Sequence, residues 1–209
     1  MTTDKLQNLD TEYDQVFFID CLPEDEYNNW KISQDLMKYL ADNGVVQTSS
    51  ICRTKKLVIA TLHHLLKIAN GGTKFCLHIV SHGDKTGLWV KSTEEDIYWE
   101  DFTKLLERIN QAMGGTLMVN MTSCLGLHGI KMVDESSEHY PFFGLVGYSD
   151  DLEVDKGKEI NKQFYKKIME GKEVQEVVTE LRNELNDDKL YCMSSQGFKI
   201  IKNKLSRHD

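Results

Sequence analysis

Two apolar runs of this chain end in side chains that can do nucleophilic chemistry. Residues 75–81 (FCLHIVS) lead into His82 and Gly83, and residues 116–123 (TLMVNMTS) lead into Cys124. Each run has the length and the apolar or β-branched content of a buried strand. Because open α/β sheets place their ligands where strands end, we expect both reactive side chains at the rim of a sheet.

A thiol and an imidazole on neighbouring strand ends form a nucleophile and its base. A free thiol is mostly protonated at neutral pH, and a nearby imidazole can accept its proton or, once charged, stabilise the thiolate. The segment between His82 and Cys124 is long enough for a helix and a hairpin, which suits a crossover between adjacent parallel strands. This pairing makes cysteine-dependent hydrolysis the leading hypothesis.

Gly83 has a role of its own in this scheme. Without a Cβ atom it lets its backbone N–H approach a substrate carbonyl closely. The N–H groups of Gly83 and Cys124 together predict an oxyanion hole. The competing interpretations are a buried cysteine beside an unrelated surface histidine, and His128 as the base, four residues after the thiol. A metal site built from Cys124 and His128 lacks further ligands at a recognisable spacing, so we expect no metal.

The composition is that of one globular domain. The chain has 209 residues, 40% apolar and 28% charged, with a formal net charge of -8. This acidic balance argues against non-specific nucleic-acid binding, which needs clustered Lys and Arg. Five cysteines without a CxxC pair indicate neither a zinc ribbon nor a redox site, and they fit a reducing compartment. The amino-terminal segment is unlike a signal peptide, and no apolar run could span a bilayer, so we expect a soluble, cytoplasmic protein.

Strand and helix patterns alternate along the chain, which predicts an α/β domain with a mostly parallel sheet. We expect this single domain to span residues 1–209, with 1–13 as a flexible or peripheral segment. The predicted strands are 16–20, 45–51, 75–81, 116–123 and 142–148, with a hairpin from 87–90 and 96–99 and a closing strand or hairpin from 190–194 and 198–201. The predicted helices are 30–42, 54–70, 99–113, 155–171 and 174–185.

The blocks FCLHIVSHG (75–83) and LMVNMTSC (117–124) resemble those of the caspase-like (clan CD) cysteine peptidases, among them caspases, metacaspases, legumain and the bacterial CHAT-domain peptidases. The downstream layout is most similar to CHAT domains: FGLVG at 143–147, then Phe164-Tyr165, then Gly171 before the last long helix. The resemblance covers roughly residues 14 to 200, nearly the whole chain.

This resemblance implies a three-layer α/β/α sandwich around a mostly parallel six-stranded sheet. It implies His82 as the base, Cys124 as the nucleophile, and the amides of Gly83 and Cys124 as the oxyanion hole. Peptide hydrolysis would proceed through an acyl-enzyme, with no metal or organic cofactor, and no third catalytic residue is required in this group.

The sequence departs from these relatives at the specificity pocket. Thr122 stands two positions before the thiol, where legumain and metacaspases carry an acidic residue and caspases carry Gln. Residues 23–26 (PEDE) stand where caspases carry an Arg that binds a substrate Asp, so cleavage after Asp is not expected. Asp150 and Asp151, after the fifth strand, are candidates to pair with a basic substrate side chain, although an ordinary turn or helix cap explains them equally simply.

CHAT peptidases are often fused to helical repeats, which this chain lacks. We therefore expect a protein substrate and a separate activator or regulatory protein, with no nucleic acid and no membrane as direct partners. Bacterial relatives include immune effectors, so a role as a partner-activated effector in bacterial defence is one hypothesis. The alternatives are a catalytically silent scaffold of the same fold that binds a partner, and a different cysteine enzyme such as an amidase or thiol transferase.

Overall fold

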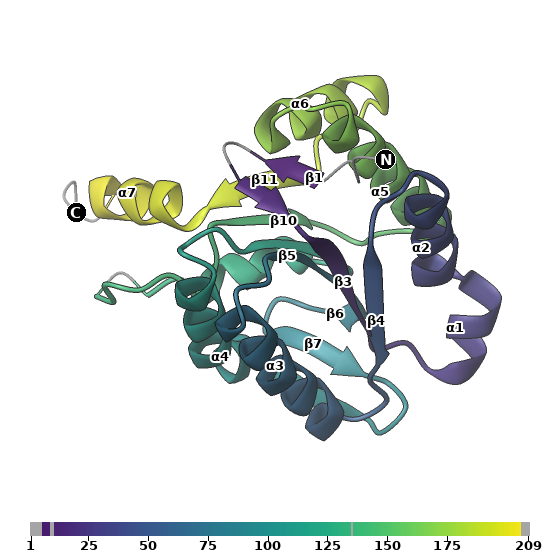
Figure 1. Cartoon of the computed structure of the whole chain (residues 1–209), viewed down its shortest axis with the longest axis horizontal. Helices are drawn as coiled ribbons and strands as arrows, with labels where there is room; N and C mark the ends of the chain where they lie inside the picture. The colour runs from purple at the N-terminus through teal and green to yellow at the C-terminus, as the bar shows by residue number, and fades with distance from the viewer. Residues whose placement is uncertain (1–5, 9–10, 135, 206–209) are drawn as a thin grey trace.

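A six-stranded sheet forms the centre of the molecule (Figure 1). The structure, a computed structural model, describes residues 6–8, 11–134 and 136–205. The sheet has the order β11-β10-β9-β5-β3-β4, and β11 is its antiparallel strand at one edge. The predicted α/β class with a mostly parallel sheet is therefore confirmed. The strands are β3 (Gln15–Asp20), β4 (Gln47–Ile51), β5 (Phe75–Val80), β9 (Met118–Thr122), β10 (Gly144–Tyr148) and β11 (Leu190–Ser194).

Helices cover both faces of this sheet (Figure 1). One face carries α3 (Lys55–Asn70) and α4 (Trp99–Ala112), which pack on each other. The other carries α2 (Ile32–Asp42), α5 (Val154–Met169) and α6 (Val174–Glu184). Because both faces are covered, every residue of β5 and of β9 is buried, and this is why those strands appear in the sequence as mostly apolar runs.

Two local predictions differ from the structure. The helix predicted over 30–42 is α2 (Ile32–Asp42), and a helix that was not predicted, α1 (Glu24–Trp30), precedes it; Lys31 between them adopts a left-handed φ of 53° and separates the two. The strand or hairpin predicted over 198–201 is wrong, because these residues lie in α7 (Ser195–Leu205). A four-residue apolar run cannot be assigned to strand or helix by periodicity.

The segment 1–13, expected to be flexible or peripheral, contains a short hairpin. Strands β1 (Leu6–Asn8) and β2 (Thr11–Tyr13) pair antiparallel, while residues 1–5 and 9–10 lie outside the described residues. Tyr13 is buried, and its hydroxyl donates to the carbonyl of Thr116 at 2.7 Å. The end of this segment therefore packs against the entry to β9.

The predicted hairpin after β5 is present and gains a third strand. It consists of β7 (Gly87–Val90) and β8 (Glu95–Tyr98), and β6 (His82–Gly83) pairs antiparallel with β7. This small sheet holds the backbone of His82 immediately after the buried strand ends. Within the described part of the chain, no helix has both the length and the apolar character needed to cross a membrane.

A buried polar network joins β5, β9 and α5 beneath the strand ends. His78 contacts the hydroxyl of Tyr165 through Nδ1 at 3.0 Å and that of Thr122 through Nε2 at 2.9 Å. Asn161 donates to the Thr122 hydroxyl at 2.7 Å and to the carbonyl of Gly157, also at 2.7 Å. Burial lowers the pKa of His78 to about 3, so its imidazole is neutral in the folded protein.

His78 should make the fold sensitive to acid. The pKa of its imidazole falls from 6.5 to about 3 on folding, so below pH 6.5 the unfolded chain takes up a proton that the folded chain does not. Going from pH 7 to pH 5, this one group should lower the free energy of unfolding by about 2 kcal/mol. Urea unfolding at both pH values measures the loss. The variant His78→Gln, which cannot titrate, should lose correspondingly less, and an equal loss in both proteins would contradict the assignment.

Candidate active site

The parallel register of β5 and β9 brings the two reactive segments together. Val80 lies opposite Thr122, and the N–H of Ser81 donates to the carbonyl of Thr122 at 3.2 Å. A Cβ atom added to Gly83 would lie 2.9 Å from the carbonyl oxygen of Cys124. The backbone after β5 therefore packs directly on the backbone after β9, and this contact leaves no room for a side chain at position 83.

His82 and Cys124 line one cleft at the carboxyl ends of the strands. The cleft has a volume of about 250 Å³. The ends of β5 and β9 form one part of its lining, and residues 152–157, which lead from β10 into α5, form another. Its apolar lining comes from six side chains: Leu22, Trp30, Ile32, Val80, Leu152 and Val154.

The Cys124 thiol is half-buried and unoxidised in a tight turn. The backbone N–H of Leu152 donates to its Sγ atom at 3.3 Å. Leu125, the next residue, has a left-handed φ of 55°, and its N–H donates to the carbonyl of Asp150 at 2.9 Å. The segment after β10 thus supports the turn from the side, and Sγ of Cys124 in turn lies 3.9 Å from the carbonyl oxygen of Leu152.

A buried carboxylate holds His82 from the side of α1. Nε2 of His82 lies 2.6 Å from Oε2 of Glu26, a side chain that is only 9% exposed. The other oxygen of Glu26 accepts from Nζ of Lys91 at 2.5 Å, which raises the pKa of Lys91. The ring of Trp30 meets the imidazole edge-on with ring centroids 5.8 Å apart. Because Glu26 and Trp30 are four residues apart, both project from one face of α1.

The contact with Glu26 determines which ring nitrogen of His82 can accept a proton. A carboxylate on Nε2 favours the tautomer with hydrogen on Nε2, and the lone pair then resides on Nδ1. Among the described residues, Glu26 is the hydrogen-bond partner of the His82 ring, so Nδ1 remains available. Sequence reasoning missed Glu26, which it placed only in an acidic segment after the first strand.

Two backbone N–H groups near the thiol have no hydrogen-bond acceptor among residues 6–8, 11–134 and 136–205. Asp84 donates to the carbonyl of Gly87 at 3.0 Å, so the alternating antiparallel pattern turns the N–H of Gly83 away from β7. Within the described part of the chain, the N–H of Cys124 makes no hydrogen bond. These are the two donors that the sequence predicts for an oxyanion hole.

The residues predicted to set specificity lie in different places. Thr122 lines the cleft, but its hydroxyl is occupied by His78 and Asn161. Asp150 and Asp151 are exposed and do not line the cleft, and the carboxylate of Asp150 lies 3.6 Å from Nζ of Lys189. The carboxylate on the cleft lining is that of Glu153, which sequence reasoning did not single out.

His128, the competing base, does not line the cleft. The pKa of its imidazole is lowered by partial burial and by the charges of Lys131 and Lys85. Among the described residues, no group of three His, Cys, Asp or Glu side chains is arranged to hold a metal ion. Of the two candidate bases, His82 is therefore the one that lines the same cleft as the thiol.

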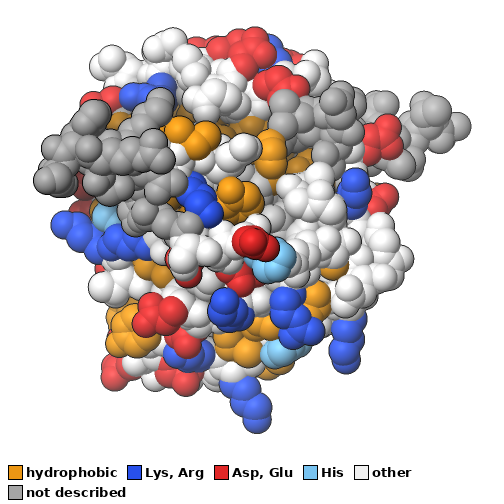
Figure 2. Space-filling view, turned by 90° about the vertical axis from the view of Figure 1, so that its left-hand side faces the viewer, with side chains coloured by type: hydrophobic (Ala, Val, Ile, Leu, Met, Phe, Trp, Pro, Cys, Tyr) orange, Lys and Arg blue, Asp and Glu red, His pale blue; other side chains and the backbone are white. Residues whose placement is uncertain are grey.

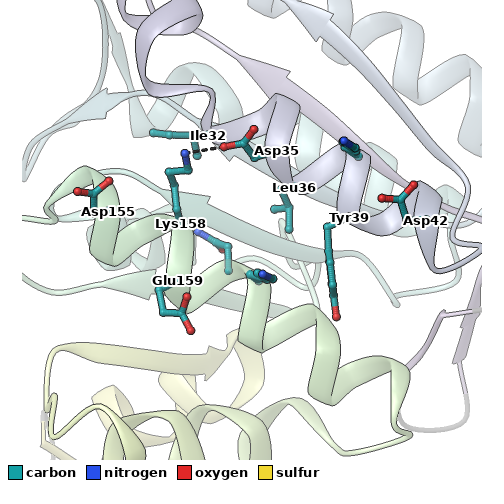
Figure 3. A pocket seen from close by; sticks show the side chains of 11 residues that line it. Ile32, Asp35, Leu36, Tyr39, Asp42, Asp155, Lys158 and Glu159 are labelled. Atoms are coloured by element: carbon teal, nitrogen blue, oxygen red, sulfur yellow. Dashed lines mark ion pairs between the residues drawn. The ribbon is translucent and has the colours of Figure 1, made fainter.

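The molecule offers a larger cavity, but its lining contains no cysteine, serine, threonine or histidine. It lies between α2 and α5, has a volume of about 470 Å³, and contains the ion pair between Lys158 and Asp35 (Figure 3). Ile32 lines both this cavity and the smaller cleft. The smaller cleft, which holds both the thiol and the imidazole, is therefore the candidate active site.

The surface on the side of the molecule opposite α1 is of mixed character. Basic and acidic side chains there are interspersed with apolar ones (Figure 2).

No protein-family model matches this chain, and no curated protein matches its sequence.

Cys124 should be the most reactive of the five cysteines. Burial raises the pKa of the Cys21, Cys52 and Cys76 thiols, and that of Cys192 to about 12, so these four are poor nucleophiles at neutral pH. Brief treatment of the folded protein with iodoacetamide, followed by peptide mass spectrometry, should find modification at Cys124 first. Modification of Cys192 ahead of Cys124 would contradict this ranking.

Proposed function

We propose that this protein is a cysteine endopeptidase of the caspase-like kind, with Cys124 as nucleophile and His82 as general base. The observation that carries the proposal is that a half-buried thiol and an imidazole held by a carboxylate line one cleft at neighbouring strand ends. Two free backbone donors at the same place fit the oxyanion of acyl transfer. A catalytically silent scaffold would have no need for these four features together.

The chemistry follows from the groups present. The thiol proton passes to Nδ1 of His82, and Sγ of Cys124 attacks the peptide carbonyl carbon. The N–H groups of Gly83 and Cys124 stabilise the negative oxygen of the tetrahedral intermediate. When the C–N bond breaks, His82 donates its proton to the leaving amine, and a thioester remains. Water then attacks the thioester, gives its proton to His82, and releases the carboxylate product and the free thiol.

Glu26 would act through His82 and not on the substrate. Its buried carboxylate fixes the ring orientation and the tautomer, and it stabilises the imidazolium that forms when the thiol is deprotonated. Lys91 pairs with the other oxygen of Glu26 and balances its charge. We assign Glu26 as a positioning residue, one that the resemblance to caspase-like peptidases does not require.

We further propose that the substrate is a protein and that a separate protein controls the activity. The support is the resemblance to CHAT-domain peptidases together with the absence of sequence repeats in this chain. The same resemblance is the ground for proposing an effector role in bacterial defence.

Removing the nucleophile should abolish activity. The variant Cys124→Ala should neither cleave peptides nor react with an electrophilic peptide probe, because no other thiol lines the cleft. Fluorescent labelling on a denaturing gel measures the reaction. Cys192→Ala, which removes a thiol outside the cleft, should label like the wild type. Labelling of Cys124→Ala equal to that of the wild type would reject the proposal.

Replacing the positioning carboxylate should slow catalysis without removing it. Glu26→Gln should lower kcat by at least about tenfold, since a comparable change in a serine protease costs far more. KM should change little, because Glu26 does not line the cleft. The pH profile of kcat should also change, since the charge beside His82 has changed, whereas a merely structural role would leave its shape alone. Glu26→Asp should recover part of the rate, and failure of this rescue alongside an unchanged pH profile would contradict the assignment.

A further inference from the structure

We propose that the cleft beside Cys124 accepts an uncharged, apolar substrate side chain of the size of leucine, methionine or phenylalanine, on the residue whose carbonyl is attacked. This inference rests on the proposed peptidase function. It replaces the basic side chain that Asp150 and Asp151 suggest in the sequence.

The walls of the cleft are mostly apolar, although the hydroxyl-bearing residues Ser81, Thr122 and Ser123 also line it. Leu22, Ile32 and Val80 form a buried cluster against which Trp30 and Val154 pack. Four of these five side chains come from outside β5, so the loop after β3, the junction between α1 and α2, and the start of α5 converge on one space. A pocket formed around a thiol by three separate connecting segments of the chain has a defined shape. Its apolar walls favour the binding of an apolar side chain.

No carboxylate is placed inside the cleft to receive a basic side chain. Asp20, at the end of β3, is buried, and its oxygens accept from the hydroxyl of Ser33 at 2.5 Å and the N–H of Leu22 at 3.0 Å. Burial raises the pKa of Asp20, which makes it a weaker partner for a cation. Glu153 lines the cleft but is exposed, so its charge lies in water at the mouth.

No basic side chain is placed inside the cleft to receive an acidic one. Apart from His82, the lining contains no positively charged or titratable basic group. Lys158, on the next turn of α5, donates to the carbonyl of Trp30 at 3.0 Å and pairs with Asp35, and it belongs to the larger cavity (Figure 3). A charged substrate side chain would therefore lose its hydration without gaining a partner, which is strongly unfavourable.

The size of the cleft fits one side chain. Its volume of about 250 Å³ lies below the range of pockets that hold drug-sized molecules. Gly157 forms part of the lining, and a Cβ atom there would already lie 3.3 Å from Leu152 and 3.5 Å from Thr122. The inner part of the cleft is thus closely packed. The charged group of a long substrate side chain would have to lie against apolar walls.

The test uses the full chain and a set of peptide acyloxymethyl ketones. The probes are identical except at the residue next to the electrophile, which is Leu, Met, Phe, Lys, Arg or Asp. The rate of labelling at Cys124, followed by mass spectrometry, should be at least about tenfold higher for the best of the three apolar probes than for any charged one. Fastest labelling by the Lys, Arg or Asp probe would overturn the inference while leaving the peptidase proposal intact. Labelling of Cys124 by iodoacetamide but by none of the six probes would overturn both.

A charge placed in the wall should reverse the preference. Val154→Asp adds a carboxylate at the first position of α5, where an acidic residue suits the helix N-terminus. It should raise the rate with the Lys or Arg probe relative to the Leu probe by about tenfold, and the matched variant Val154→Leu should not. Asp151→Asn, outside the cleft, should leave the preference unchanged. If instead the wild type reacts fastest with the Lys or Arg probe and Asp151→Asn removes that preference, the substrate side chain does not bind in this cleft and the inference is wrong. Thermal melting of each variant establishes that it is folded.

Discussion

The parallel register of β5 on β9 is the constraint on which the rest of the structure depends. Side chains along a strand alternate between faces, so His78 and Val80 point to one side of the sheet, as does Thr122, which lies opposite Val80 on the neighbouring strand. A slip of one residue would turn the side chains of β5 to the opposite face from their present neighbours on β9 and would shift the segment that carries His82 relative to the one that carries Cys124. The buried contact between His78 and Thr122, with its third partner Asn161 on α5, opposes such a slip, because it would leave polar groups unpaired in the core.

The first crossover of the fold supports the site from the other side. Helix α1 is only seven residues long, yet it directs Glu26 to the imidazole nitrogen and Trp30 to the edge of the same ring. From β7, Trp89 lies against the imidazole with ring centroids 5.6 Å apart, and Lys91 in the turn after β7 pairs with Glu26, so two separate segments hold one histidine. An orientation determined from two sides is what a general base requires, since catalysis depends on geometry before it depends on pKa.

The two strand ends could be predicted from the sequence because each follows a run of mostly apolar residues that are adjacent in the chain. Glu26 could not be, since the contact joins residues 56 positions apart and an acidic residue after proline also suits an ordinary helix start. The orientation of the Asp150 and Asp151 side chains could not be predicted from the sequence either. The chain turns after β10 so that Leu152 and Val154 line the cleft and the two aspartates face solvent, and no local pattern reports that turn.

The central claim is that His82 activates the thiol of Cys124, and the rate of thiol alkylation tests it without a substrate or an activator. Only the thiolate reacts, so a base that takes the thiol proton raises the rate. At neutral pH, His82→Ala should slow the reaction of Cys124 with iodoacetamide by at least about tenfold, while His128→Ala should leave it unchanged. Equal rates in the wild type and in His82→Ala, with both proteins folded, would contradict the account.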